Sequence, residues 1–190
     1  NFLKKYEHRK CKIYLLHGDL TDQEMHSLYK HPKIKVLVSL SHGEGFGLPL
    51  FEAAYSGLPV IATDWSGHLD FLYMPVKDKK NKGKEKYKAH YGKVDYDLQP
   101  VQKTAVWDGV IQADSMWAYA QQGSYKMKLR EVYKEHGRFV KQAKTLQKWI
   151  LKNFTAEQQY AAFNDHIKAW LIPSASDEEI DDLFSQLAQE

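Results

Sequence analysis

The chain has 190 residues, of which 43% are hydrophobic and 27% are charged, and its formal net charge is +3. This composition is ordinary for a globular protein, and the length suits one domain with a substantial core. All apolar runs are strand-sized, so we expect no membrane span. We also expect no nucleic-acid partner. The single cysteine, Cys11, excludes an internal disulfide and favours a reducing compartment, the cytoplasm.

Strands and helices alternate in the first part of the chain, residues 1–110. The apolar pattern and the helix caps predict the end of a helix at 2–10, strands at 12–16, 34–40 and 58–63, and helices at 22–30 and 48–56. Gly57 is the expected stop of the second full helix. Such alternation predicts a Rossmann-like parallel sheet flanked by helices, an α/β fold.

The chain becomes strongly basic at residues 77–93, which contain eight lysines and show no apolar period. We therefore expect a mobile basic surface loop there. A short edge strand is predicted at 94–98, ending before Pro100.

The remainder of the chain is predicted to be helical. Helices are expected at 115–122, 124–136, 138–153 and 155–171, with the region 111–173 packing on the same domain. The tail, 174–190, holds six acidic residues and no lysine or arginine. Ser176 and Glu179 form a capping-box pattern ahead of apolar residues at helical spacing, so the tail is predicted to be an acidic amphipathic helix.

The most distinctive stretch is 39–52, where an apolar strand leads into a helix. Gly43, Gly45 and Gly47 allow the backbone to turn tightly and to approach a ligand closely, and Pro49 suits a helix start. The free N–H groups and the dipole of that helix favour an anion such as a diphosphate.

Two carboxylates flank this turn, and both can accept hydrogen bonds from hydroxyl groups. Glu44 lies in the loop and Glu52 lies in the helix, which we place in its first turn. Gly18 and Asp64 fall at the carboxyl ends of neighbouring predicted strands, the edge at which parallel sheets bind ligands. The implied ligand is anionic and rich in hydroxyls.

Residues 44–63 read EGFGLPLFEAAYSGLPVIAT. This sequence resembles the donor-site signature of the retaining glycosyltransferase family four, which has the GT-B fold. The likeness extends upstream through 13–25 and downstream through 64–70, and it covers about residues 11–72. The helices beyond Trp107 are similar in a looser way.

The resemblance implies a role for each matching residue. Glu44 would be the catalytic residue and would hydrogen-bond hydroxyls of the transferred sugar, and Glu52 would hold the nucleotide ribose. The other implied donor-binding residues are Gly45, Phe46, Gly47 and Leu48 in the loop, Gly18 and Leu20 beside the nucleobase, and His42 near the phosphate. The donor would be a nucleoside-diphosphate sugar, with no cofactor and no metal ion, and the acceptor is unspecified.

The resemblance also implies that the chain is the C-terminal, donor-binding half of a GT-B enzyme. The acceptor domain and an upstream Arg/Lys pair for the diphosphate would then be supplied by the same or another chain. We expect the 190-residue chain alone to be inactive.

Two other functions fit parts of the sequence. One is a nucleotide-sugar-binding module without catalysis of its own. The other is an NAD-dependent dehydrogenase, because Gly43 and Gly45 follow a strand and Asp64 lies 21 residues after Gly43. The third glycine of a dinucleotide fingerprint would fall on Leu48, which counts against the dehydrogenase.

Overall fold

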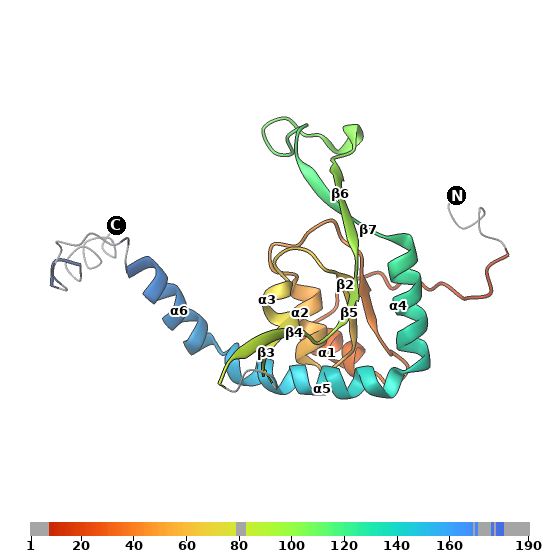
Figure 1. Ribbon diagram of the computed structural model, residues 1–190, viewed down its shortest axis with the longest axis horizontal. Helices are drawn as coiled ribbons and strands as arrows, with labels where there is room; N and C mark the ends of the chain where they lie inside the picture. Colours follow the sequence, from red (N-terminus) through yellow and green to blue (C-terminus); the bar gives the residue numbers. More distant parts are fainter. Residues whose placement is uncertain (1–7, 79–82, 169, 171–175, 177, 181–190) are drawn as a thin grey trace.

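The computed structural model describes residues 8–78, 83–168, 170, 176 and 178–180 (Figure 1). The helices are α1 (Asp22–Lys30), α2 (Leu48–Tyr55), α3 (Leu69–Leu72), α4 (Gln122–Lys134), α5 (His136–Asn153) and α6 (Ala156–Lys168), with a 3-10 turn at Lys103–Ala105. The strands are β1 (Leu37–Ser39), β2 (Val60–Thr63), β3 (Tyr73–Lys77), β4 (Glu85–Ala89), β5 (Gly92–Val94), β6 (Tyr96–Pro100) and β7 (Met116–Ala120).

A parallel sheet in the order β1-β2-β5 forms the centre of the molecule. Its middle strand, β2, is buried along its whole length, as expected of a parallel strand covered on both faces. Val60 and Ala62 belong to one apolar cluster, and Ile61 belongs to another. This alternation shows that helices cover the two faces of the sheet, which confirms the predicted Rossmann-like α/β class.

The two apolar clusters assign helices to the two faces. The larger cluster joins Leu50 of α2 and Leu146 of α5 to Phe71 of α3. The smaller one joins Val132 of α4 and Phe139 of α5 to the other face of the sheet. Burial of such side chains stabilises the fold by about 1.5–3 kcal/mol each, so these clusters fix the helices against the strands that carry the candidate site.

Local sequence explains where the first two helices begin. Thr21 caps α1, because its hydroxyl accepts from the Glu24 N–H while the Glu24 carboxylate accepts from the Thr21 N–H. Gly47 precedes α2 with a φ of 85°, a left-handed conformation that favours glycine. Pro49 then lies within the first turn of α2, where its missing N–H costs nothing.

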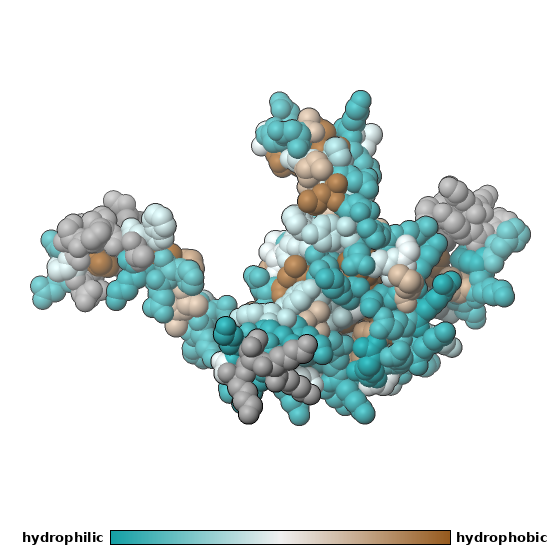
Figure 2. Space-filling model, viewed as in Figure 1, coloured by the Kyte–Doolittle hydropathy of each residue, from teal (hydrophilic) through white to brown (hydrophobic). Residues whose placement is uncertain are grey.

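Two antiparallel two-stranded sheets lie outside the central parallel sheet. β3 pairs with β4, and β6 pairs with β7, each with five paired residues. Figure 1 shows the β6–β7 hairpin standing out from the body beyond the end of β5. Figure 2 shows apolar surface on this hairpin, to which exposed Leu98, Trp107, Val110 and Met116 contribute.

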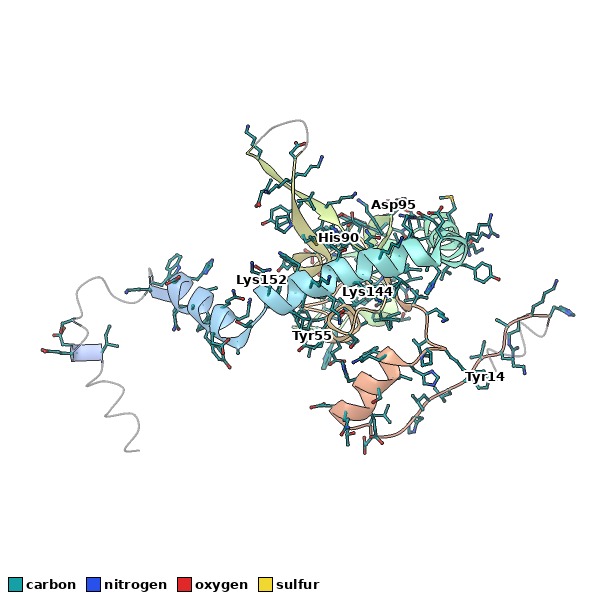
Figure 3. The ribbon with its side chains drawn as sticks, turned by 90° about the horizontal axis from the view of Figure 1, so that it is seen from below. Tyr14, Tyr55, His90, Asp95, Lys144 and Lys152 are labelled. Atoms are coloured by element: carbon teal, nitrogen blue, oxygen red, sulfur yellow. The ribbon has the colours of Figure 1, made fainter. Side chains whose placement is uncertain are left out.

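Several predicted elements differ from the structure. Residues 12–16 are not a strand: they are exposed, with Leu15 at 89%, and no backbone hydrogen bond joins them to the described sheet. An apolar run becomes a strand only beside a pairing partner. In Figure 3, Tyr14 lies on a segment that runs away from the body. The helix predicted at 2–10 falls mainly outside the described residues, and 8–10 are not helical.

The basic region and the following strand also differ. Residues 77–93 do not form a loop throughout, because β4 pairs with β3 and β5 joins the parallel sheet. The strand predicted at 94–98 is divided at Asp95 into the end of β5 and the start of β6. A two-stranded ribbon exposed on both faces has no apolar period, so its lysines concealed the strand.

The helical region is only partly as predicted. The helix predicted at 115–122 is wrong: β7 occupies Met116–Ala120, where Trp117 and Tyr119 alternate with alanines and pair with β6, and α4 begins at Gln122. α4 and α5 pack on the domain, but α6 has no buried residue and extends away from it (Figure 1). The predicted capping box of the tail is present, since Ser176 and Glu179 bond reciprocally. The rest of the tail helix lies outside the described residues.

Candidate functional site

The candidate site lies at the carboxyl ends of β1 and β2, where two loops meet. One loop follows β1 and carries Glu44, and the other follows β2 and carries Ser66. The Ser66 hydroxyl accepts a hydrogen bond from the Glu44 N–H at 2.6 Å and donates one to the Glu44 carbonyl at 2.6 Å. The Gly67 N–H donates to the same carbonyl at 3.0 Å. The backbone of Glu44 is therefore fixed by the neighbouring loop.

At Gly67 the two loops lie too close together for any residue larger than glycine. A Cβ atom added to Gly67 would lie 1.9 Å from the carbonyl oxygen of Gly45. Gly45 itself has open space at its own Cβ position. Glycine at 67 is thus required by the close approach of one backbone to another, whereas Gly45 is open toward the site.

The loop after Glu44 presents unused backbone donors. The N–H groups of Gly45, Phe46 and Gly47 donate no hydrogen bond within the described chain. They precede the start of α2, where helix dipole and free N–H groups favour an anion. The Phe46 ring packs on Phe51 and Phe71 at centroid distances of 5.2 and 5.0 Å, which holds the loop on the core. Leu48, at the first position of α2, is 63% exposed.

Glu52 lies further along α2 than expected. It is the fifth residue of the helix, so it is not in the first turn, and it faces α1. Its Oε2 accepts a hydrogen bond from the Tyr29 hydroxyl at 3.1 Å. Burial, and then the hydrogen bond and charge of Glu52, raise the pKa of Tyr29 to about 12, so the phenol stays protonated and donating.

A cavity of about 350 Å³ opens beside this pair. Its apolar walls are Met25, Phe51 and Tyr55, and Figure 3 shows Tyr55 on the side of the body where α1 lies. Its polar lining comes from Asp22, His26, Tyr29, Glu52 and Ser56. Apolar walls with a few convergent polar groups are typical of small-molecule sites.

His42 connects the loop to the β6–β7 hairpin. Its Nδ1–H donates to the Ala118 carbonyl at 2.8 Å, and its ring stacks on Trp117 with centroids 4.9 Å apart. The Tyr119 ring also packs on His42, tilted and with centroids 4.4 Å apart. His42 therefore anchors the hairpin beside the glycine-rich loop.

Gly18 and Leu20 make no direct contact with the two carboxylates of the site. Both lie in the exposed segment before α1, and neither has a hydrogen bond or ring contact with Glu44 or Glu52 in the described chain. The structure thus gathers the residues predicted between His42 and Leu48 and places Glu52 at the adjacent cavity, and the assignment of Gly18 and Leu20 to the nucleobase stays a prediction.

Asp64, at the end of β2, is occupied by internal contacts. Its Oδ1 accepts from the hydroxyls of Tyr73 at 2.7 Å and Tyr91 at 2.6 Å, and its Oδ2 pairs with Lys93. Burial acts to raise the pKa of Asp64, but the hydrogen bonds from Lys93, Tyr91 and Tyr73 outweigh it and lower the pKa. Asp64 therefore holds the loop that carries Ser66.

Other polar atoms at this end of β2 remain unused. Thr63 Oγ1 and His68 Nδ1 are buried and have no hydrogen-bond partner in the described chain. His68 lies next to the start of α2, because a Cβ on Gly47 would meet its Cβ at 3.1 Å. The described residues hold no cluster of three or more metal-ligating side chains.

Sequence reasoning missed Tyr29 as the partner of Glu52 and the hydrogen bonds of Ser66 to Glu44. Each pair is more than 20 residues apart in the chain, so no local spacing marks it.

For the membrane, no helix among the described residues combines the length and apolar character needed to cross it.

Comparison with known proteins gives one match. Residues 5–76 match the model of the family described as "Glycosyl transferases group 1". No curated protein and no solved structure shows significant similarity to the chain. The matched region contains β1, β2, the Glu44 loop and the Glu52 helix. The family match thus supports a glycosyltransferase, and the parallel sheet flanked by helices is consistent with its Rossmann-like domain.

Proposed function

We propose that the chain is the nucleotide-sugar-binding half of a retaining family-four glycosyltransferase with the GT-B fold. It binds a nucleoside-diphosphate sugar and transfers the sugar to an acceptor held by another domain. The observation that carries the proposal is the loop at the end of β1: a fixed Glu44 next to unpaired backbone N–H groups at the start of α2. That combination suits a ligand with hydroxyls and a diphosphate.

The diphosphate lies at the start of α2. The N–H groups of Phe46 and Gly47 donate to its oxygens, and the dipole of α2 adds to their effect. Each hydrogen bond to a charged oxygen contributes about 1.5–3 kcal/mol. Such donors replace a metal ion in offsetting the diphosphate charge, so the reaction proceeds without one.

The nucleoside occupies the cavity between α1 and α2. Its ribose hydroxyls donate to Glu52, whose Oε2 is held by Tyr29 and whose Oε1 has no partner in the described chain. The base lies against the apolar wall that contains Phe51 and Tyr55. The carboxylate can thus accept from ribose without losing its internal contact.

Transfer proceeds with retention of configuration. The bond between the sugar's anomeric carbon and the diphosphate breaks, and the acceptor oxygen bonds that carbon on the same face. Glu44 accepts from a sugar hydroxyl and stabilises the oxocarbenium-like transition state, while the backbone donors stabilise the departing diphosphate. The acceptor proton passes to the leaving phosphate oxygen. The reaction takes place in the cytoplasm.

Glu44→Gln in the full-length enzyme tests this proposal. The variant should turn over about 10²–10³-fold more slowly than the parent, because it loses a charge that stabilises the transition state. Release of nucleoside diphosphate from nucleotide sugars, with and without simple acceptors, measures turnover, and circular dichroism checks folding. Near-normal turnover would remove Glu44 from the mechanism. Tight donor binding without acceptor-dependent release by the parent would instead indicate a binding module.

A further inference from the structure

We propose that Ser66 is a positioning residue that sets the direction of the Glu44 carboxylate toward the donor sugar. The inference rests on the proposed role of Glu44 and adds a residue from a different loop. Ser66 does not itself touch the sugar. It acts through the backbone of Glu44.

One hydroxyl group satisfies both polar groups of the Glu44 backbone. Ser66 Oγ accepts from the N–H and donates to the carbonyl, each at 2.6 Å, and Gly67 adds a third hydrogen bond. Fixing the N–H and the carbonyl of one residue restricts its φ and ψ, and these angles direct its Cα–Cβ bond. The Ser66 hydroxyl therefore sets the direction in which the Glu44 side chain leaves the backbone.

The backbone at Ser66 is strained, which argues that the hydroxyl is used. Ser66 has a φ of 84°, and it is the only non-glycine residue with positive φ in the described chain. Glycine would adopt this conformation without the cost of about 1–3 kcal/mol that other residues incur. The hydrogen bonds to Glu44 are what serine supplies there and glycine lacks.

The rest of the loop is rigid enough to transmit this constraint. Asp64 is held by Tyr73, Tyr91 and Lys93, and the Nε2–H of buried His68 donates to the Thr63 carbonyl at 2.7 Å. Ser66 thus lies between two anchored residues. Its hydroxyl is presented to Glu44 by a loop whose own anchors, Asp64 and His68, bond to residues outside the Glu44 loop.

Exchange of the Glu44 amide proton tests the contact directly. In Ser66→Ala and Ser66→Gly, this proton should exchange at least ~10-fold faster than in the parent, because its acceptor is gone. Ser66→Gly relieves the backbone strain, so it keeps the loop folded if Ser66→Ala does not. Thr145→Ala removes another hydroxyl bonded to a carbonyl, on α5, and should leave the Glu44 amide unchanged. Unchanged exchange in both Ser66 variants would overturn the inference.

Donor binding tests the consequence. The probes are UDP, GDP and ADP, each compared with UDP-glucose, GDP-mannose or ADP-glucose, and the readout is the fold increase in affinity that the sugar adds. Ser66→Ala and Ser66→Gly should lower that increase by ~3–10-fold, as expected when a hydrogen bond to a charged group is weakened, with the affinity for the nucleotide alone unchanged.

The outcomes separate the two proposals. If Glu44→Gln lowers the sugar-dependent increase and neither Ser66 variant does, the positioning role is wrong and the proposed function stands. If Glu44→Gln also leaves it unchanged, the role of Glu44 fails, and the positioning role fails with it. A loss in all three variants, with nucleotide affinity preserved, supports the inference.

Discussion

Removing the Asp64 carboxylate should destabilise the fold by about 1.5–5.5 kcal/mol, a magnitude that follows from its three partners. Tyr91 is only 4% exposed, so Asp64→Ala leaves a buried hydroxyl unsatisfied at a cost of about 1–3 kcal/mol. Tyr73 is half-buried, and the loss of its hydrogen bond to Asp64 lowers the free energy of unfolding by about 0.5–1.5 kcal/mol. The Lys93 side chain is 44% exposed and regains water, so its ion pair adds only about 0–1 kcal/mol.

Urea unfolding followed by circular dichroism at neutral pH measures this loss. Asp70→Ala is the matched control, because Asp70 is exposed on α3 and its carboxylate makes no hydrogen bond or ion pair in the described chain. It should change the free energy of unfolding by less than about 0.5 kcal/mol. An Asp64→Ala value no larger than the control value would refute the assignment of Asp64 as the anchor of its loop.

The effect should depend on pH with a defined sign. The pKa of Asp64 is lowered below the ordinary value of 3.8 in the folded chain, despite the opposing effect of burial. Its contribution to stability is therefore complete above the unfolded pKa and is lost as the pH falls through the folded pKa. The difference in unfolding free energy between parent and Asp64→Asn should shrink below about pH 4. A difference that stayed constant down to pH 2 would contradict this reasoning.

Three further predictions follow from particular contacts. Gly67→Ala should destabilise the fold by about 1–3 kcal/mol in urea unfolding, because its Cβ meets the Gly45 carbonyl, whereas Gly45→Ala should fold normally. Glu52→Ala should weaken nucleotide binding by about 1.5–3 kcal/mol in calorimetry and lower the preference for ribose over 2′-deoxyribose; equal preference in both proteins would count against the ribose role. Ultraviolet titration should show the Tyr29 phenol ionising at about pH 12, and Tyr29→Phe should lack that step; ionisation near pH 10 would mean that neither the burial of this phenol nor its contact with Glu52 holds in solution.

The central sheet was predictable because its strands have a local signature. β2 is a continuous apolar run between Pro59 and a polar loop, as a strand covered on both faces should be. Residues 12–16 have the same signature and yet are exposed, because strand formation also depends on a neighbour that local sequence does not specify. β4 was missed for the opposite reason, since an exposed ribbon has no apolar period.

The site was predictable where its residues are neighbours in sequence. The spacing of glycines around Glu44 and the start of α2 follow from turn and helix chemistry, and the structure places them as expected. The contacts of Ser66 with Glu44 and of Tyr29 with Glu52 arise only after the sheet brings distant loops together. The helix begins at Leu48 as predicted, but a turn holds only 3.6 residues, so Glu52, the fifth residue, falls in the second turn and not in the first as we expected.

The β3–β4 ribbon also affects how the sheet can assemble. β2 and β5 are adjacent in the sheet, but Ile61 pairs with Gly92 across a long stretch of chain. The ribbon lies inside that stretch, and its first pair joins Tyr73, which is 12 residues after Ile61, to Ala89, which is three residues before Gly92. The entropy cost of closing a loop rises with its length, so an early local hairpin leaves only two short connections to order. A β3–β4 ribbon that formed before the sheet would shorten the loop that β5 must close to reach β2.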